Sequence, residues 1–327
     1  MPCFHPLQAF FTVGEDGKKI VKFSNVGARL FHNDVKPVGD NNLSIPCGRC
    51  MGCRLERSRQ WAVRIMHEAK LYSDNCFVTL TFNDDGLSSQ CVNNSLDRNH
   101  VRLFLYRLRS RFRRGVDVID RRTGLVKDVY KRDKIRVFYC GEYGDKLGRP
   151  HYHLCLFNMD FPDKKVFKRS KGFVYYVSDD LSLLWPYGNC MISDLTFDSA
   201  AYVARYCLKK ITGDQADDHY QGRLPEFCQA SLKPGIGYDW LVRYGNSDCF
   251  NLDEVVVNGH KCKPPRYYDK YLEKVNPEMY AMAKVLRSVD GQRRNERNGD
   301  ATYRRLLARE KCQEARVNNL VRMLERS

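Results

Sequence analysis

The chain has 327 residues, of which 43% are hydrophobic and 29% are charged, so a wholly disordered or collagen-like protein is excluded. Lys and Arg total 55 against 39 Asp and Glu, and the net charge of +16 indicates a polyanionic partner, with nucleic acid ahead of an anionic membrane. No apolar run reaches the roughly 18 residues that span a bilayer, and no signal peptide is expected. The 14 cysteines are too scattered for a disulfide framework, which favours reduced thiols in a cytoplasm.

Elements of the first half follow from periodicity and turn residues. Residues 1–45 alternate short apolar pieces with turn residues, which predicts loops and short strands without a clear register. A helix is expected over 54–71, a strand over 76–82, and a second helix of about 18 residues that ends near Arg114. Strands are then predicted over 134–141 and 151–157, and the turn residues 144–150 join them as a hairpin.

Elements of the second half complete an α+β pattern. Weaker strands over 173–177 and 190–195 flank a short helix over 181–185, and a helix begins at Asp198 or Ser199 and runs to about Ile211. This order predicts an α+β domain, with a mainly antiparallel central sheet and flanking helices, over 72–213. A Cys-rich segment, 1–71, precedes that domain. A basic region, 214–327, follows it and is largely helical at its end.

The segment His151-Tyr152-His153 lies on a predicted strand, where alternate side chains share one face. Two imidazoles on one face can bind one divalent cation, and the hairpin brings Glu142 beside them as an oxygen ligand. The alternative is a pair of solvent-facing or core histidines. The hairpin-placed carboxylate favours a metal site.

Two tyrosines are one helical turn apart on the last predicted helix. At about 100° per residue, Tyr202, Tyr206 and Lys209 share one face, flanked by Arg205 and Lys210. The apolar side chains collect on the opposite face, so we expect the tyrosines on a cationic face and not in the core. A phenol there could attack a phosphodiester while the cations stabilise the developing charge. The alternative is a pair of surface tyrosines on a basic helix.

Together these motifs resemble the HUH endonucleases, which are named for a His-hydrophobic-His motif. The resemblance rests on the strand 77–82, the segment 141–154 and the tyrosine helix 202–210, in that order. Within the superfamily the chain is similar to the two-tyrosine replication initiators of microviruses, and most of all to the gokushovirus type. The resemblance covers about 72–213 and implies an HUH endonuclease fold there.

The resemblance implies a metal-dependent nickase that opens a circular phage DNA duplex at its origin. It places Mg²⁺ or Mn²⁺ at His151, His153 and Glu142. One tyrosine becomes linked to a 5′-phosphate and leaves a 3′-OH primer; the other later cuts the regenerated origin, and the displaced strand is rejoined into a circle. No Gly-x-x-x-x-Gly-Lys-Ser/Thr loop is present, so a host helicase and a host DNA polymerase are expected partners in the cytoplasm of the infected bacterium.

Two weaker patterns concern the cysteines and the arginines. Cys47, Cys50 and Cys53 have the spacing of part of a zinc site, to which Cys3 or His5 would add a fourth ligand; reduced structural thiols are an equal alternative. The predicted helix that ends near Arg114 is rich in arginine, and phosphate contacts are expected from it, from the basic C-terminal tail and from the tyrosine helix. The residues expected to bind DNA are Arg107, Arg109, Arg111, Arg113, Arg114, Arg205 and Lys210.

Two other functions compete with a phage initiator. An HUH relaxase or transposase would use similar chemistry on another DNA. A non-enzymatic, zinc-dependent DNA-binding regulator would use the cysteines and the arginine-rich helix, and would leave the placement of the histidines and tyrosines unexplained.

Overall fold

The computed structural model describes residues 3–13, 19–23, 42–120, 122–144, 147–170, 172–205, 215–299 and 302–319. The chain divides into two compact units. Unit 1 comprises Met1–Arg57 and Asn276–Arg322, and unit 2 comprises Ser58–Val275 with Met323–Ser327. Unit 1 therefore joins the two end regions of the chain, whereas the central region forms unit 2. The division into segments 1–71, 72–213 and 214–327 stays a prediction.

A seven-stranded sheet forms the centre of unit 2, with its strands in the order β12-β7-β8-β4-β11-β10-β9. All neighbouring strands in it are antiparallel. The strands are β4 (Asn75–Thr81), β7 (Arg136–Tyr143), β8 (Pro150–Phe157), β9 (Lys165–Ser170), β10 (Phe173–Val177), β11 (Cys190–Asp194) and β12 (Phe227–Ala230). The predicted α+β class, with a mainly antiparallel central sheet and flanking helices, is confirmed.

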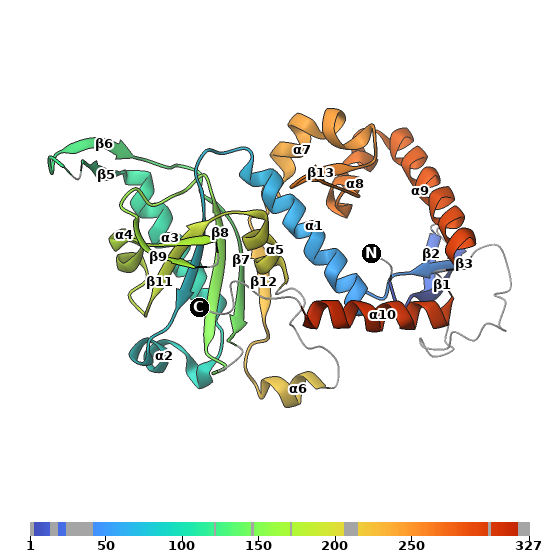
Figure 1. Ribbon diagram of the computed structural model, residues 1–327, viewed down its shortest axis with the longest axis horizontal. Helices are drawn as coiled ribbons and strands as arrows, with labels where there is room; N and C mark the ends of the chain where they lie inside the picture. The colour runs from blue at the N-terminus through green and yellow to red at the C-terminus, as the bar shows by residue number, and fades with distance from the viewer. Residues whose placement is uncertain are drawn as a thin grey trace. The chain divides into compact units, whose positions relative to one another are not determined.

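Side chains of β8 alternate between two cores, as the two-residue period of a strand requires. Tyr152 and Leu154 belong to a core on one face of the sheet, together with Leu108 and Phe112 of α3 (Arg98–Arg114). Cys155 belongs to a second core on the other face, together with residues of α1 (Met51–Ala69) and α5 (Phe197–Arg205). Helices therefore cover both faces of the sheet (Figure 1).

The helix α3 shows why the sequence pattern predicts this structure well. Asp97 caps its start by accepting a hydrogen bond from the backbone N–H of Asn99, and Gly115 follows its end with φ of 100°, which favours glycine. The expected apolar face is buried, including Val101 and Phe112. The other helices of unit 2 are α2 (Asp84–Gln90), η1 (Val92–Asn94), α4 (Asp179–Leu184), α6 (Gln215–Tyr220), α7 (Tyr238–Gly245), η2 (Asn246–Phe250) and α8 (Arg266–Val275).

Several short strands have no counterpart in the sequence prediction. Two small hairpins, β5–β6 (Val116–Ile119 and Val126–Tyr130) and β13–β14 (Val255–Val257 and His260–Cys262), lie outside the central sheet. The edge strand β12 pairs with β7, so a segment beyond residue 213 extends the central sheet. Such pairings join residues far apart in sequence, and local periodicity does not indicate them.

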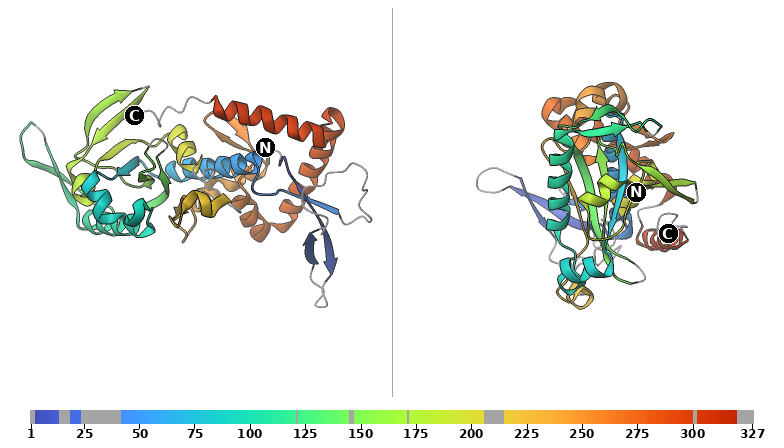
Figure 2. Two further views of the ribbon diagram at one scale, coloured as in Figure 1. Left: turned by 90° about the horizontal axis from the view of Figure 1, so that it is seen from below. Right: turned by 90° about the vertical axis from the view of Figure 1, so that its left-hand side faces the viewer.

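Unit 1 combines a small sheet with two C-terminal helices. The strands β1 (Leu7–Val13), β2 (Lys19–Phe23) and β3 (Asn42–Ile45) are antiparallel in the order β2-β1-β3. The helices are α9 (Pro277–Asn298) and α10 (Tyr303–Asn318), and the expected helical end of the chain is confirmed as far as Asn318. Figure 2 draws the blue strands and the red helices, which come from opposite ends of the chain but belong to one compact unit. Among the described residues, no helix has both the length and the apolar character that crossing a bilayer requires.

Candidate metal centre and nucleophile

The antiparallel pairing of β7 with β8 brings the predicted ligands together. Glu142 lies directly opposite His151 in the register of the two strands, and His153 lies two residues further along the same face. In the turn between the strands, Gly148 has φ of 61°, and its N–H donates to the carbonyl of Gly144 at 2.9 Å. A hairpin of this kind fixes the three side chains on one face of the sheet.

The three side chains converge on one carboxylate oxygen. Nε2 of His151 and Nε2 of His153 each lie 2.8 Å from Oε1 of Glu142. The two imidazole rings are 5.0 Å apart between centroids and nearly perpendicular, at 88°. All the candidate ligand atoms of the cluster lie within 4.8 Å of one another. Such a set of two nitrogens and one oxygen is suited to a divalent cation with further positions for water or phosphate.

The far nitrogen of each imidazole has its own partner, and this orients the ring. Nδ1 of His151 lies 3.2 Å from the carbonyl oxygen of Arg149. Nδ1 of His153 lies 3.0 Å from Oγ1 of Thr79, which faces it across the β4–β8 pair. When Nε2 of His151 gives up its proton to bind a metal, a proton on Nδ1 can still donate to the carbonyl oxygen of Arg149 and keep the ring in place. Sequence reasoning missed Thr79, because the register between β4 and β8 cannot be read from the sequence.

Electrostatics of the cluster favour an ionised carboxylate. Glu142 is only 1% exposed, and burial alone would raise its pKa. Hydrogen bonds and charge interactions with His151 and His153 oppose burial and lower the pKa of Glu142 to about 2. The carboxylate is therefore charged near neutral pH and can act as a hard oxygen ligand.

The structure places Tyr202 against the histidine cluster but not on an exposed face. Its ring centroid is 5.1 Å from that of His153, in an edge-to-face arrangement at 84°. Phe77 stacks on the same imidazole at 5.6 Å and contacts Tyr202 at 6.3 Å. Tyr202 is 6% exposed and belongs to the second core, so the expectation that it avoids the core is wrong. A helical wheel records one helix only, whereas this tyrosine is buried against strands β4 and β8.

The remaining residues of the tyrosine motif are only partly described. Arg205 is half-buried at the end of α5. Tyr206, Lys209 and Lys210 lie outside the described residues. Their roles, and the extension of the helix to Ile211, stay predictions.

The arginines of α3 lie on the other face of the sheet from the histidine cluster, because α3 packs on the core that contains Tyr152. Arg109 donates hydrogen bonds to the carbonyl of Ile135, and Arg111 forms an ion pair with Asp180. The guanidinium of Arg107 lies 5.5 Å from the ring centroid of Tyr187. The exposed predicted arginines of this helix are Arg113 and Arg114. DNA binding by all five stays a prediction.

The four predicted cysteines also come together, in unit 1. Sγ atoms of Cys3, Cys47, Cys50 and Cys53 all lie within 4.8 Å of one another. His5 is not part of this group, since its Nε2 lies 2.6 Å from a carboxylate oxygen of Glu310. Burial alone would raise the pKa of Cys50, but hydrogen bonds, chiefly from the backbone N–H groups of Cys53 and Phe4, lower it to about 7.

Comparison with known proteins defines the class of the chain. The family model of the replication-associated protein ORF2/G2P matches residues 75–211, which include the central strands and the histidine cluster. The replication-associated protein VP4 of Bdellovibrio phage phiMH2K is 34% identical over 282 residues, which cover 86% of this chain and 80% of the relative. The replication-associated protein ORF2 of Spiroplasma virus 4 is 32% identical over 286 residues, 84% of this chain and 81% of that protein.

A third relative, the replication-associated protein ORF4 of Chlamydia phage 1, is 30% identical over 243 residues, 72% of this chain and 55% of the relative. No solved structure matches. The chain therefore belongs to the family of phage replication-associated proteins.

Proposed function

We propose that this protein initiates rolling-circle replication by nicking one strand of a circular phage DNA duplex at its origin. The observation that carries the proposal is the convergence of Glu142, His151 and His153 beside the ring of Tyr202. The relatives, which are named as replication-associated proteins of phages, indicate the biological process. The proposal adds the chemistry.

The histidine cluster fits a divalent cation. Two Nε2 atoms and one ionised carboxylate oxygen point to one place, and the rings are held by Thr79 and by the carbonyl of Arg149. A mixed nitrogen and oxygen set suits Mn²⁺, and Mg²⁺ would complete its coordination with water. Such an ion, when bound, supplies Lewis-acid polarisation of the phosphate that is to be cut.

The tyrosine hydroxyl is the proposed nucleophile. In the first transfer, Oη of Tyr202 or Tyr206 forms a bond to phosphorus, and the bond from phosphorus to the 3′-oxygen breaks. The phenol loses a proton and the departing 3′-oxygen gains one, so the products are a 5′-phosphotyrosyl linkage and a free 3′-OH. The contacts of Tyr202 with Phe77 and His153 would hold its ring beside the phosphate that the cluster binds. Lys209 would stabilise the charge that develops on phosphate.

The second tyrosine would carry out the cleavage that ends a round of replication. It attacks the regenerated origin in the same way, and the new 3′-OH then attacks the first phosphotyrosine and displaces its phenolate. Each step exchanges one phosphoester bond for another, so joining requires no nucleotide cofactor. The products are closed single-stranded circles.

The net charge of +16 supports a DNA substrate, because cations that neutralise phosphates release counterions and supply affinity that does not depend on sequence. The exposed Arg113 and Arg114 are candidates for such contacts, together with Arg205 and Lys210. Strand separation and synthesis would be carried out by a host helicase and polymerase in the infected cell.

A plasmid assay tests the proposal. Purified protein is incubated with a supercoiled plasmid that carries the phage origin, with Mn²⁺ or Mg²⁺, and the products are separated on denaturing gels. We expect nicked circles that carry covalently attached protein at the 5′ end, and a free 3′-OH that a polymerase can extend.

The matched control removes only the two hydroxyl groups. In the Tyr202→Phe/Tyr206→Phe variant both aromatic rings are retained, so we expect DNA binding without nicking and without an adduct. Nicking by this variant at the wild-type rate would overturn the proposed nucleophiles, and nicked products with a free 5′-phosphate would indicate hydrolysis by water.

A further inference from the structure

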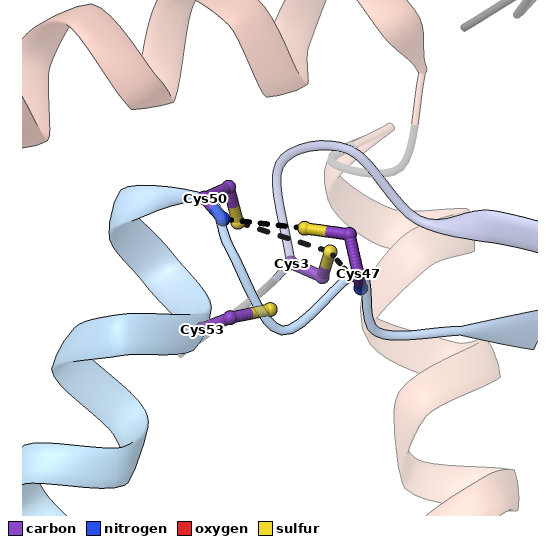
Figure 3. A group of neighbouring side chains, drawn as sticks. All are labelled: Cys3, Cys47, Cys50 and Cys53. Atoms are coloured by element: carbon purple, nitrogen blue, oxygen red, sulfur yellow. Dashed lines mark hydrogen bonds between the residues drawn. The ribbon is translucent and has the colours of Figure 1, made fainter. Parts of the chain in front are cut away.

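Four cysteine thiols from two separate chain segments meet in unit 1. Cys3 precedes β1, whereas Cys47 and Cys50 lie between β3 and α1, and Cys53 lies in the first turn of α1. Figure 3 shows the four sulfur atoms pointing toward a common centre. Sγ of Cys50 lies 3.8 Å from Sγ of Cys3, which is the spacing of two ligands around one ion and well beyond a disulfide bond of about 2.05 Å.

Backbone N–H groups are aimed at these sulfur atoms. Those of Arg49 and Cys50 donate to Sγ of Cys47 at 3.4 and 3.3 Å, and that of Phe4 donates to Sγ of Cys50 at 3.3 Å. The N–H of Cys47 donates to Sγ of Cys3 at 3.2 Å. Hydrogen bonds from the backbone stabilise a thiolate and fix its direction, as the outer shell of a metal site does.

We propose that Cys3, Cys47, Cys50 and Cys53 bind one structural Zn²⁺ ion. Four cysteine sulfur atoms within 4.8 Å of one another match the all-cysteine tetrahedral sites that zinc prefers. All four coordination positions come from the protein, so the site has none for a substrate or a reactive water. It is therefore structural, and it is separate from the proposed nicking chemistry of unit 2.

The small core of unit 1 explains what the ion would do. In the described part of this unit, only five hydrophobic residues are buried: Phe4, Ala9, Cys50, Ala283 and Leu306. Phe4, Cys50 and Leu306 form one cluster, with the other three cysteines packed against it. So little apolar burial rarely holds a small unit together, and a metal is a usual substitute. Zinc would join Cys3 to the start of α1 and give the small core its centre.

Metal content of the full chain tests the inference directly. The protein is expressed in medium with zinc, purified under reducing conditions without chelator, and analysed for zinc and iron by mass spectrometry. We expect about one zinc per chain, which resists a mild chelator. Replacement by Co²⁺ should produce the intense charge-transfer absorption of a thiolate site.

Two single variants separate the cluster from the other cysteines. Cys47→Ser removes one ligand and should lower zinc content below about a tenth of an equivalent. Cys312→Ser, at an exposed cysteine of α10 in the same unit, should leave it at about one equivalent. The three tryptophans, Trp61, Trp185 and Trp240, all lie in unit 2, so their fluorescence reports whether unit 2 of each variant has folded.

Limited trypsin digestion then shows what zinc does for unit 1. We expect zinc removal by a strong chelator to expose sites in unit 1, and Zn²⁺, but not Mg²⁺, to restore protection. Full protection of the wild-type chain without zinc would overturn the inference. Iron in place of zinc, or a disulfide between these cysteines in the freshly purified protein, would also overturn it. Because the readouts are metal content and proteolysis, the result is independent of nicking activity.

Discussion

The histidine cluster and the cysteine cluster both gather ligand atoms within 4.8 Å, but different parts of the chain hold them in place. Glu142, His151 and His153 stand on two paired strands inside the seven-stranded sheet, with large apolar cores on both faces. The four cysteines lie on two segments, residue 3 and residues 47–53, around a core of three buried residues of which Cys50 is one. Hydrogen bonds and packing of the sheet therefore hold the ligands of the histidine cluster in place. The cysteine cluster has few contacts of this kind around it.

This difference predicts that a metal would serve chemistry at the histidine cluster and folding at the cysteine cluster. Where a sheet already fixes the ligands, an ion can be exchanged without loss of the fold, and chemistry can be placed there. Where the ligands are themselves the main connection between segments, binding of the ion contributes directly to folding. We therefore expect loss of activity from changes in the first site, and loss of local structure from changes in the second.

The largest expected effect is on nicking. The His151→Ala/His153→Ala variant should nick an origin plasmid at least about a thousandfold more slowly, because Lewis-acid stabilisation is worth several kcal/mol. Its zinc content should stay at about one per chain, since the cysteine cluster lies in another unit. A gel-shift assay should show DNA affinity within a factor of about three, because the basic surface is unchanged.

A matched variant controls for the loss of two imidazoles. His219→Ala/His260→Ala removes two exposed histidines of unit 2 and should nick at the wild-type rate. Full nicking by the His151→Ala/His153→Ala variant would contradict the metal assignment. A loss of zinc from that variant would contradict the independence of the two sites.

The sequence predicts the site best where the ligands are near neighbours. A nine-residue separation between Glu142 and His151 spans one hairpin, so strand alternation and turn residues suffice to place both, and the structure brings them together. Tyr202 shows the limit: its burial depends on Phe77 and His153, which are distant in sequence. The fold shows the same limit, because β12 pairs with β7 across more than eighty intervening residues.

Charge patterning is the weakest guide. The arginines of α3 form a run of like charges in the sequence, yet Arg111 pairs with Asp180 and Arg109 donates to the carbonyl of Ile135. These partners become neighbours only when the sheet is assembled. The pattern therefore indicates a basic helix, but the arginines that can contact DNA are identified only from the folded structure.

The second prediction concerns division of labour between the tyrosines. Tyr202→Phe and Tyr206→Phe should each still cleave an origin oligonucleotide, because one hydroxyl remains. Each should release at least about ten-fold fewer closed circles, since the second transfer lacks its nucleophile. The products are counted on gels after exonuclease treatment. If one variant were inactive while the other cleaved and circularised normally, the proposed nicking reaction would use a single nucleophile.

The third prediction tests how unit 2 is stabilised. His67 is 1% exposed, stacks on Trp240 at 3.5 Å between centroids, and shares a hydrogen bond of 2.9 Å with Tyr268. Burial, together with the charge of Lys70, lowers its pKa from 6.5 to about 3, so the folded chain binds this proton less readily than the unfolded chain. Stability from this histidine is complete above pH 6.5 and falls as the pH decreases toward 3. At pH 5 the loss is about 2 kcal/mol relative to neutral pH.

Denaturant unfolding followed by tryptophan fluorescence measures this loss in unit 2. The His67→Asn variant, which keeps a polar group near Tyr268, should be less stable at neutral pH but should lose about 2 kcal/mol less on acidification to pH 5. His260→Asn, at an exposed position, should retain the wild-type pH dependence. An unchanged pH dependence in the His67→Asn variant would show that another group causes the acid sensitivity.

The smallest effect is expected at Thr79. This prediction tests whether a single side chain of β4 orients an imidazole of the histidine cluster. Thr79→Val keeps the shape of the side chain but removes the hydroxyl 3.0 Å from Nδ1 of His153. Without that partner the ring is less well oriented, so the Mn²⁺ concentration for half-maximal nicking should rise about ten-fold, whereas the rate at saturating Mn²⁺ should stay nearly the same. Thr79→Ser should restore the wild-type value. Thr81→Val, on the same face of β4, removes a hydroxyl that donates to the carbonyl of Asn189 and should not change it. A lower rate at saturating metal in Thr79→Val, with no shift in the metal requirement, would mean that Thr79 acts on packing of the strand and not on the imidazole.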